Sequence, residues 1–110
     1  MPSHAYLLVM TTCPDQASAE RLARALVESR RAACVHVLPA GTSYYRWQEA
    51  LETGVEHTLL IKTRDPQYRA VEHLIREHHP YEVPEVIAVP LTYGDQRYLA
   101  WIDQNVSVEQ

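Results

Sequence analysis

Cys34 and His36 stand two residues apart in a short, mostly apolar segment. Residues 33–38, bounded by Pro39, are typical of a β-strand, and alternate side chains of a strand project from the same face. A thiolate and an imidazole about 7 Å apart on one face could together bind a soft or borderline ion such as Cu(I) or Zn(II). The alternative is a buried cysteine beside a hydrogen-bonded histidine.

His78 and His79 are a second candidate for metal binding, close to Glu82. Consecutive helical residues point about 100° apart, so the two rings cannot chelate one ion as an i, i+4 pair does. One ring could bind an ion together with Glu82 or with a residue of a neighbouring subunit. Alternatively, His78 packs on the apolar face of a helix and His79 caps its last carbonyl groups. The other histidines are expected to be surface or hydrogen-bonded residues: His4, His57 and His73.

Lys62 follows an apolar run, where a lysine either pairs with a carboxylate or ligand or extends its ammonium group into water. Glu82 and Glu85 are suitable carboxylates. If Lys62 meets the aromatic residues of the hairpin and loop, an amphipathic cleft between subunits results, suited to a small anion or a metal. The predicted ligand cleft comprises Trp47, Lys62, Tyr81 and Glu85, with Glu82 shared with the metal site.

Signatures of catalysis are missing, and the sequence predicts a protein that is not an enzyme. It has 3 glycines, too few for a Gly-rich phosphate loop, and no Gly-x-Ser-x-Gly. A Cys34–His79 nucleophile–base pair across a subunit boundary is conceivable, but only Arg30 and Arg31 stand near enough to activate the thiol. Cys-x-x-Cys and His-Glu-x-x-His are also absent, so any metal site is expected between subunits or to be weak.

The composition predicts a single folded domain over residues 1–110. The chain is 46% hydrophobic with a net charge of −4, which gives no electrostatic support to a nucleic-acid partner. Its apolar runs are too short to span a membrane, and residues 1–4 lack the basic start of a signal peptide. A cytoplasmic protein with reduced Cys13 and Cys34 is therefore expected.

Hydrophobic periodicity predicts the order strand–helix–strand–strand–helix–strand, followed by a terminal helix. Strands are expected at residues 5–10, 33–38, 43–47, 55–62 and 86–91, with turns or breaks at residues 39–42 and 49–54. The first helix is expected from Gln16 to Arg31 with Asp15 as N-cap, and the second from an Asp65-Pro66 start to Pro80. The last helix should begin after Gly94-Asp95. This is an α+β, ferredoxin-like βαββαβ sandwich with a long hairpin and a C-terminal helix.

Five segments in order resemble the divalent-cation tolerance (CutA) family, over roughly residues 6–103. They are Thr11-Thr12-Cys13-Pro14-Asp15, residues 28–35 (ESRRAACV), Ser43-x-Tyr45-x-Trp47 with Ile61-Lys62-Thr63, His79-Pro80-Tyr81-Glu82-x-Pro84-Glu85, and Gly94-Asp95-x-x-Tyr98-Leu99-x-Trp101. The chain departs from the family pattern at Cys13, at His36 (usually asparagine) and at Glu49 (usually glycine). The last change touches the turn of the predicted hairpin.

The resemblance implies a homotrimer whose sheets face one another around a three-fold axis. Leu7 and Leu8, like Leu59 and Leu60, fit this because they place apolar side chains on both faces of their strands. It also implies tolerance to divalent cations, copper above all, through metal binding at His79 and Cys34 and, more weakly, at His78 and Glu82. The family resembles the PII signal transducers, so a signalling or scaffold module that binds a small ligand or a protein partner is the alternative.

Overall fold

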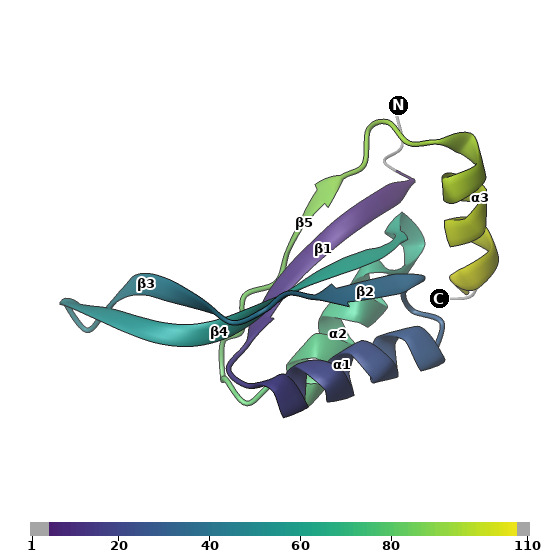
Figure 1. The fold of residues 1–110 in the computed structure, drawn as a ribbon. Helices are drawn as coiled ribbons and strands as arrows, with labels where there is room; N and C mark the ends of the chain where they lie inside the picture. The colour runs from purple at the N-terminus through teal and green to yellow at the C-terminus, as the bar shows by residue number, and fades with distance from the viewer. Residues whose placement is uncertain (1–4, 108–110) are drawn as a thin grey trace.

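Residues 5–107 are described by the computed structural model, and they form an antiparallel sheet with α-helices on one face and across one end (Figure 1). The strands are β1 (Tyr6–Cys13), β2 (Cys34–Val37), β3 (Gly41–Trp47), β4 (Ala50–Arg64) and β5 (Ile87–Pro90). The helices are α1 (Gln16–Glu28), α2 (Tyr68–His78), α3 (Gln96–Asn105) and the short 3-10 helix η1 (Asp65–Gln67). His4 lies outside the described residues.

The predicted ferredoxin-like arrangement is confirmed. The strand order is β2-β4-β1-β5, and β3 also pairs with β4, so the second strand of the βαββαβ unit is divided into β2 and β3. Helices α1 and α2 lie together on one face of the sheet (Figure 1). Alternate residues of β1 and β4 face them, and burial of these apolar side chains drives the packing. The core includes Leu7, Val9, Leu22, Leu26, Leu59, Ile61, Val71 and Ile75.

Helix α1 begins as predicted and ends earlier than predicted. The Asp15 carboxylate accepts a hydrogen bond of 2.7 Å from the backbone N–H of Ser18, which makes Asp15 the N-cap. The predicted end at Arg31 is wrong, because Arg30 takes a positive φ of 62° and the helix stops at Glu28. Arg30 then reaches α3 by donating to the carbonyl of Gln104 at 2.6 Å.

The second helix also begins later than predicted. Asp65 and Pro66 belong to η1, whose N-cap is Arg64, and α2 starts at Tyr68 without a side-chain cap. The predicted capping role of Asp65 is therefore wrong. The predicted stop at Pro80 is confirmed, since α2 ends at His78 and His79 is extended, as the residue before a proline prefers to be.

Strands β3 and β4 form the long hairpin that projects from the sheet (Figure 1). The predicted turn at residues 39–42 and the predicted break at residues 49–54 are wrong, because β3 starts at Gly41 and β4 runs for 15 residues from Ala50. Trp47 pairs with Ala50, so the chain reverses at Gln48 and Glu49, whose φ angles are 49° and 66°. Two-residue turns with positive φ at both positions match the twist of the strands.

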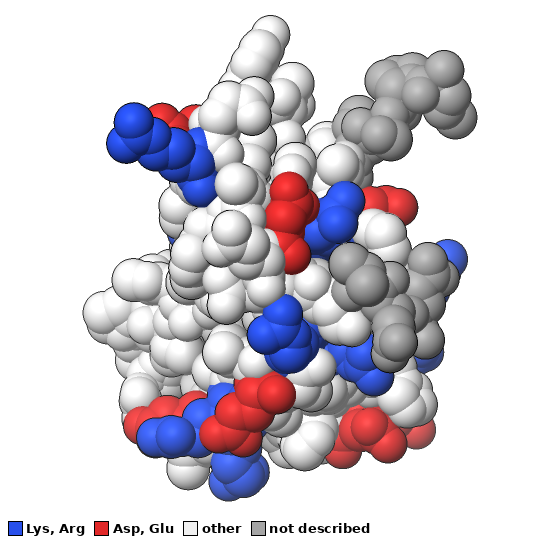
Figure 2. Space-filling view, turned by 90° about the vertical axis from the view of Figure 1, so that its right-hand side faces the viewer, with Lys and Arg blue, Asp and Glu red and all other residues white. Residues whose placement is uncertain are grey.

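Within residues 5–107, the other face of the sheet is covered at one end, by α3. Ile102 and Val106 pack against Ala33, while Tyr6 donates a hydrogen bond of 2.9 Å to Asp103. The Asp103 carboxylate also forms an ion pair with Arg64 at 3.1 Å. Figure 2 views this end of the molecule and shows lysine and arginine interspersed with acidic residues rather than gathered in one patch.

Beyond α3, this second face carries apolar side chains that no helix of the described part of the chain covers. Register places Leu8 and Met10 of β1 beside Leu60 of β4 and beside Val89 and Ile87 of β5. Ile87 and Val89 are 51% and 43% exposed. These five residues are called the open face below. Within residues 5–107, no helix is long and apolar enough to cross a membrane.

The N-cap of α1 makes stability depend on pH. The hydrogen bond from the Ser18 backbone N–H lowers the pKa of Asp15, so its contribution to the free energy of unfolding is complete above the ordinary aspartate pKa. It is lost as the pH falls through the lowered pKa. We expect Asp15→Ala to unfold at lower urea than wild type at pH 7, and this gap to close in acid. Asp15→Asn, which retains an acceptor oxygen, should be less affected at pH 7; equal losses in the two variants would contradict the assignment.

The hairpin turn stores backbone strain at Glu49. A residue with a side chain at φ 66° occupies the left-handed region, which glycine adopts without penalty. Glu49→Gly is therefore expected to raise the free energy of unfolding by about 0.5–1 kcal/mol, measured by urea denaturation at fixed protein concentration. Glu49→Ala is the matched control, since it removes the same carboxylate and keeps the Cβ atom. An equal gain from both variants would assign the effect to charge instead.

Candidate functional site

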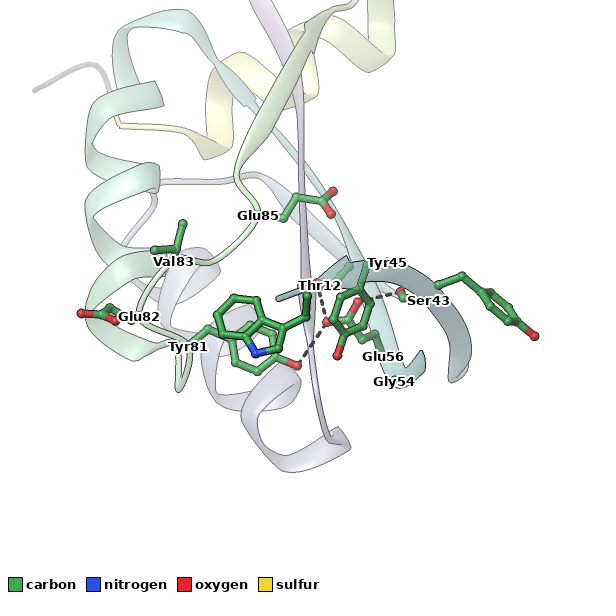
Figure 3. Close-up of a pocket in the computed structure, with 11 residues that line it drawn as sticks. Thr12, Ser43, Tyr45, Gly54, Glu56, Tyr81, Glu82, Val83 and Glu85 are labelled. Carbon is green, nitrogen blue, oxygen red and sulfur yellow. Dashed lines mark hydrogen bonds between the residues drawn. The ribbon is translucent and has the colours of Figure 1, made fainter. Parts of the chain in front are cut away.

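A cleft of about 750 Å³ lies between the hairpin and the loop that follows α2 (Figure 3). Strand β1 contributes Thr12, the hairpin contributes aromatic residues and Glu56, and the loop contributes Tyr81, Glu82, Val83 and Glu85. Pro80 and Pro84 fix the backbone of this loop, because each has a locked φ and restricts the residue before it. This cleft, called the hairpin cleft below, contains three of the four predicted ligand-cleft residues: Trp47, Tyr81 and Glu85.

Glu56 is the central charged group of the hairpin cleft. Its Oε1 accepts a hydrogen bond of 2.7 Å from Ser43, and its Oε2 accepts bonds of 3.1 Å from Thr12 and 3.2 Å from Tyr81 (Figure 3). The three donors come from β1, β3 and the loop after α2, so the carboxylate joins three separate segments. Burial and then the charge of Glu56 raise the pKa of Tyr81, which keeps the phenol protonated as a donor.

The Tyr45 ring lies over Gly54 on the wall of the same cleft. A Cβ atom at Gly54 would lie 3.7 Å from the Tyr45 ring and its hydroxyl oxygen, in ordinary contact distance. Four aromatic side chains line the cleft, and all keep a large part of their surface exposed: Tyr44 (71%), Tyr45 (48%), Trp47 (62%) and Tyr81 (41%). The hairpin cleft therefore combines one fixed carboxylate with accessible aromatic surface.

His79 lies behind the cleft, with both ring nitrogens in hydrogen bonds. Nε2 donates to the backbone carbonyl of Thr12, and Nδ1 accepts from the backbone N–H of Tyr81 at 3.1 Å. The imidazole thus links β1 to the loop after α2, and its 9% exposure is consistent with a structural role. A metal at His79 would have to displace one of these bonds. His78, by contrast, is exposed at the end of α2, so its predicted alternative of packing on the apolar face is wrong.

Cys34 and His36 lie at the edge of the open face, away from the hairpin cleft. Cys34 is opposite Lys62 in the β2–β4 ladder, and His36 is opposite Leu60. The intervening Val35 packs against the core, so Cys34 and His36 share the other face of β2 as predicted. Cys34 is partly exposed, His36 is exposed, and Cys34 is a free thiol.

Lys62 does not enter the hairpin cleft of its own chain. Its ammonium group donates a hydrogen bond of 3.0 Å to the hydroxyl of Tyr98 in α3. This bond raises the pKa of Lys62, which therefore stays charged. The predicted pairing with Glu82 or Glu85 is not found within the chain, because Glu82 and Glu85 lie in the loop beside the hairpin (Figure 3).

The predicted metal ligands are separated within one chain. Cys34 and His36 lie on β2, while His78, His79 and Glu82 lie at the end of α2 and in the following loop. Among the described residues, no group of three or more His, Cys, Asp or Glu side chains could hold a metal ion. The second thiol, Cys13, is buried at the end of β1, and burial raises its pKa.

Sequence reasoning missed Glu56, which is the best-connected charged group of the cleft. Glu56 lies in the predicted strand 55–62, whose alternating pattern made it one polar residue among several. A signal was nevertheless present: Ser43 and Gly54 pair directly, so Glu56 lies diagonally across the hairpin from Ser43. This diagonal position of Ser43 and Glu56 follows only once the register of β3 on β4 is known.

The same architecture and sequence recur in known proteins. A family model described as CutA1 divalent ion tolerance protein matches residues 7–105. The divalent-cation tolerance protein CutA of Yersinia pestis (strain Pestoides F) is 39% identical over 100 residues, which are 91% of this chain and 84% of that protein. The crystal structure of CutA from Xylella fastidiosa has a TM-score of 0.92 at 44% identity, covering 94% of this chain and 99% of that chain.

A further solved structure is the periplasmic divalent cation tolerance protein CutA from Archaeoglobus fulgidus, with a TM-score of 0.90 at 30% identity over 93% of this chain and 99% of that chain. Fold and site together define a ferredoxin-like α+β protein with a projecting hairpin and an open sheet face. The chain belongs to the CutA1 divalent ion tolerance family.

The two neighbouring histidines should differ in their effect on stability. His79→Ala leaves the carbonyl of Thr12, in a part-buried hydrogen bond, without this donor, so we expect it to lower the free energy of unfolding by about 1–3 kcal/mol. His78→Ala, at an exposed position of the same segment, should change it by less than about 0.5 kcal/mol. Urea denaturation of both variants at one protein concentration tests this, and equal effects would argue against the structural role of His79.

Proposed function

We propose that this chain contributes to divalent-cation tolerance by binding a metal ion directly, without catalysing a reaction. Membership of the divalent ion tolerance family supports the physiological role. The observation that carries the proposed site is the pair Cys34 and His36, which share one face at the edge of the sheet. Thiolate and imidazole ligands favour Cu(I) and Zn(II), so copper is the first metal to test and zinc the second.

His79 contributes to metal binding less directly in this proposal. Both ring nitrogens of His79 are already in hydrogen bonds, with Thr12 and Tyr81, and a metal would have to compete with these bonds. Among the described residues, His36 has no hydrogen bond of this kind. His78 and Glu82 are exposed and remain candidates for additional ligands, supplied to a neighbouring copy. Because Cys34 and His36 supply only two ligands, a complete site needs further ligands from another copy or from water.

We also propose that three copies assemble through the open face. Its five apolar residues lie beyond the reach of α3, and exposed apolar surface of this kind marks an association surface. Cys34 and His36 lie at the border of the same face, so assembly would bring these pairs towards residues of other copies. We further propose that the protein acts in the cytoplasm, where both thiols stay reduced.

Ligand sensing, in the manner of PII-like proteins, is a second candidate function. One observation favours it, namely the hairpin cleft of about 750 Å³, whose size suits a small organic molecule. A protein partner docking on the projecting hairpin would belong to the same class of function. Metal binding at Cys34 and His36 does not exclude it, since the two sites lie on different parts of the sheet.

Native mass spectrometry of the untagged protein tests the metal proposal. We expect a trimer that binds Cu(I) or Zn(II), and an affinity at least about tenfold weaker in Cys34→Ser/His36→Asn, because both donor atoms are lost. The asparagine at position 36 is the residue usual in the family. Copper K-edge spectroscopy should detect a sulfur ligand in wild type only.

His73→Asn is the matched control for removal of a histidine. His73 is an exposed residue of α2 that pairs with Glu77 of its own helix, so the variant should bind metal as wild type does. Equal metal affinity of wild type and Cys34→Ser/His36→Asn would overturn the proposed site. A monodisperse monomer would overturn the proposed assembly.

A further inference from the structure

We propose that the hairpin cleft binds a small organic cation, specifically a primary amine on an apolar body. This inference rests on the second candidate function, ligand sensing, and does not depend on metal binding at Cys34 and His36. The proposed ligand also differs from the small anion or metal expected from the sequence. The sequence predicted an amphipathic cleft that includes Lys62 and suits an anion or a metal, but Lys62 binds Tyr98 at the other end of the sheet.

The charge of the cleft is negative. Its charged lining residues are Glu56, Glu82 and Glu85, and no lysine or arginine of the described chain lines it. Glu56 forms no ion pair with any described basic residue, and its three donors are all neutral hydroxyl groups. A carboxylate without a cation beside it is costly in a site with limited access to water, and no described basic residue supplies a cation here. A bound cation would relieve this cost.

Glu56 also retains capacity for one more hydrogen bond. A carboxylate offers about four lone-pair positions, and three are taken by Ser43, Thr12 and Tyr81. The three hydroxyl groups fix the orientation of the carboxylate before a ligand arrives. An ammonium group placed against Oε1, which has one donor, would complete the set with a charge-assisted bond. This favours a primary amine over a quaternary ammonium ion, which has no N–H to donate.

The walls of the cleft suit the rest of such a ligand. Tyr45, Trp47 and Tyr81 expose ring surface around Glu56, and aromatic faces attract cations and cover apolar groups. Figure 3 shows Tyr81 reaching Glu56 from the loop and Tyr45 overlapping Glu56 in this view, with Glu85 above them and Glu82 on the side of the loop away from Glu56. The volume of about 750 Å³ is large enough for a ring attached to a short amine chain.

A bare divalent ion fits this cleft less well than an amine. Metal ions of this class need several oxygen, nitrogen or sulfur ligands that converge on one point. Within residues 5–107, no three His, Cys, Asp or Glu side chains converge in this way, and the Glu56 oxygens already accept hydroxyl groups. The aromatic walls supply no metal ligands, whereas they are what an organic cation uses.

Titration with 2-phenylethylamine, followed by ¹H–¹⁵N NMR in the presence of EDTA, tests the proposal. The two tryptophan indole N–H signals report on different places, because Trp47 lines the cleft and Trp101 stacks on Tyr98 in α3. We expect the Trp47 signal to shift and the Trp101 signal to stay unchanged. The neutral 2-phenylethanol and the anionic 3-phenylpropionate, which have the same ring, should bind at least about tenfold more weakly.

Glu56→Gln should weaken binding of the amine at least about tenfold, since the charge is lost and the size of the side chain is kept. Glu52→Gln is the matched control. Glu52 lies on the same face of β4 as Glu56, nearer the hairpin tip, but it is exposed and does not line the cleft. The Glu52→Gln variant should therefore bind the amine with the affinity of wild type. Cys34→Ser/His36→Asn should also bind the amine normally, which separates this test from the metal proposal.

Three results would overturn the inference. They are no shift of Trp47 at millimolar amine, equal binding of the amine and the alcohol by wild type, and unchanged amine binding by a folded Glu56→Gln protein. The comparison of amine with alcohol uses wild type alone, so it remains decisive even if Glu56→Gln disturbs folding.

Discussion

The uninterrupted pairing of β4 is the constraint on which the remainder of the structure depends. This strand runs for 15 residues and pairs with β1, β2 and β3. Because side chains alternate along it, Leu59, Ile61 and Thr63 face the helices, whereas Glu56, Leu60 and Lys62 face the other side. One residue of slippage would exchange the two sets and expose the core. The register of β4 therefore fixes the core, the open face and the carboxylate of the cleft together.

The same strand explains why the predicted ligand cleft is divided. Glu56 and Lys62 share a face but are six residues apart, or about 20 Å along an extended strand. Glu56 meets the loop after α2, while Lys62 meets α3 and lies opposite Cys34. Sequence reasoning grouped Lys62 with Glu82 by charge complementarity alone, which carries no information on distance. As a result, the pair Cys34 and His36, proposed to bind metal, and the aromatic cleft lie at separate places on one sheet.

Local signals predicted the start of α1 and the end of α2 correctly, but not the end of α1, the start of α2 or the hairpin. Pro80, the Asp15 cap and the apolar periodicities each act within a few residues, so the ends they set at Gln16 and His78 were predicted correctly. Strand β4 was cut short because Glu49, Glu52 and Gly54 resemble a polar break, although long-range pairing with β3 makes them extended or part of the turn. The intrinsic preference of a residue for a strand depends strongly on its tertiary context, so pairing with another strand can override it.

Several residues that line the candidate site were predicted from the sequence, but the hydrogen bonds that hold them in place were not. The loop from His79 to Glu85 was predicted to supply Tyr81, Glu82 and Glu85 to candidate sites, and these three residues do line the cleft. The burial of His79 depends on a carbonyl of β1 that is 67 residues away, and no local pattern reveals such a contact. His79 therefore supports the loop that presents Tyr81 to Glu56, and its imidazole shapes the cleft without entering it. A residue can thus lie in one of the segments that resemble the family and act on the site through its neighbours.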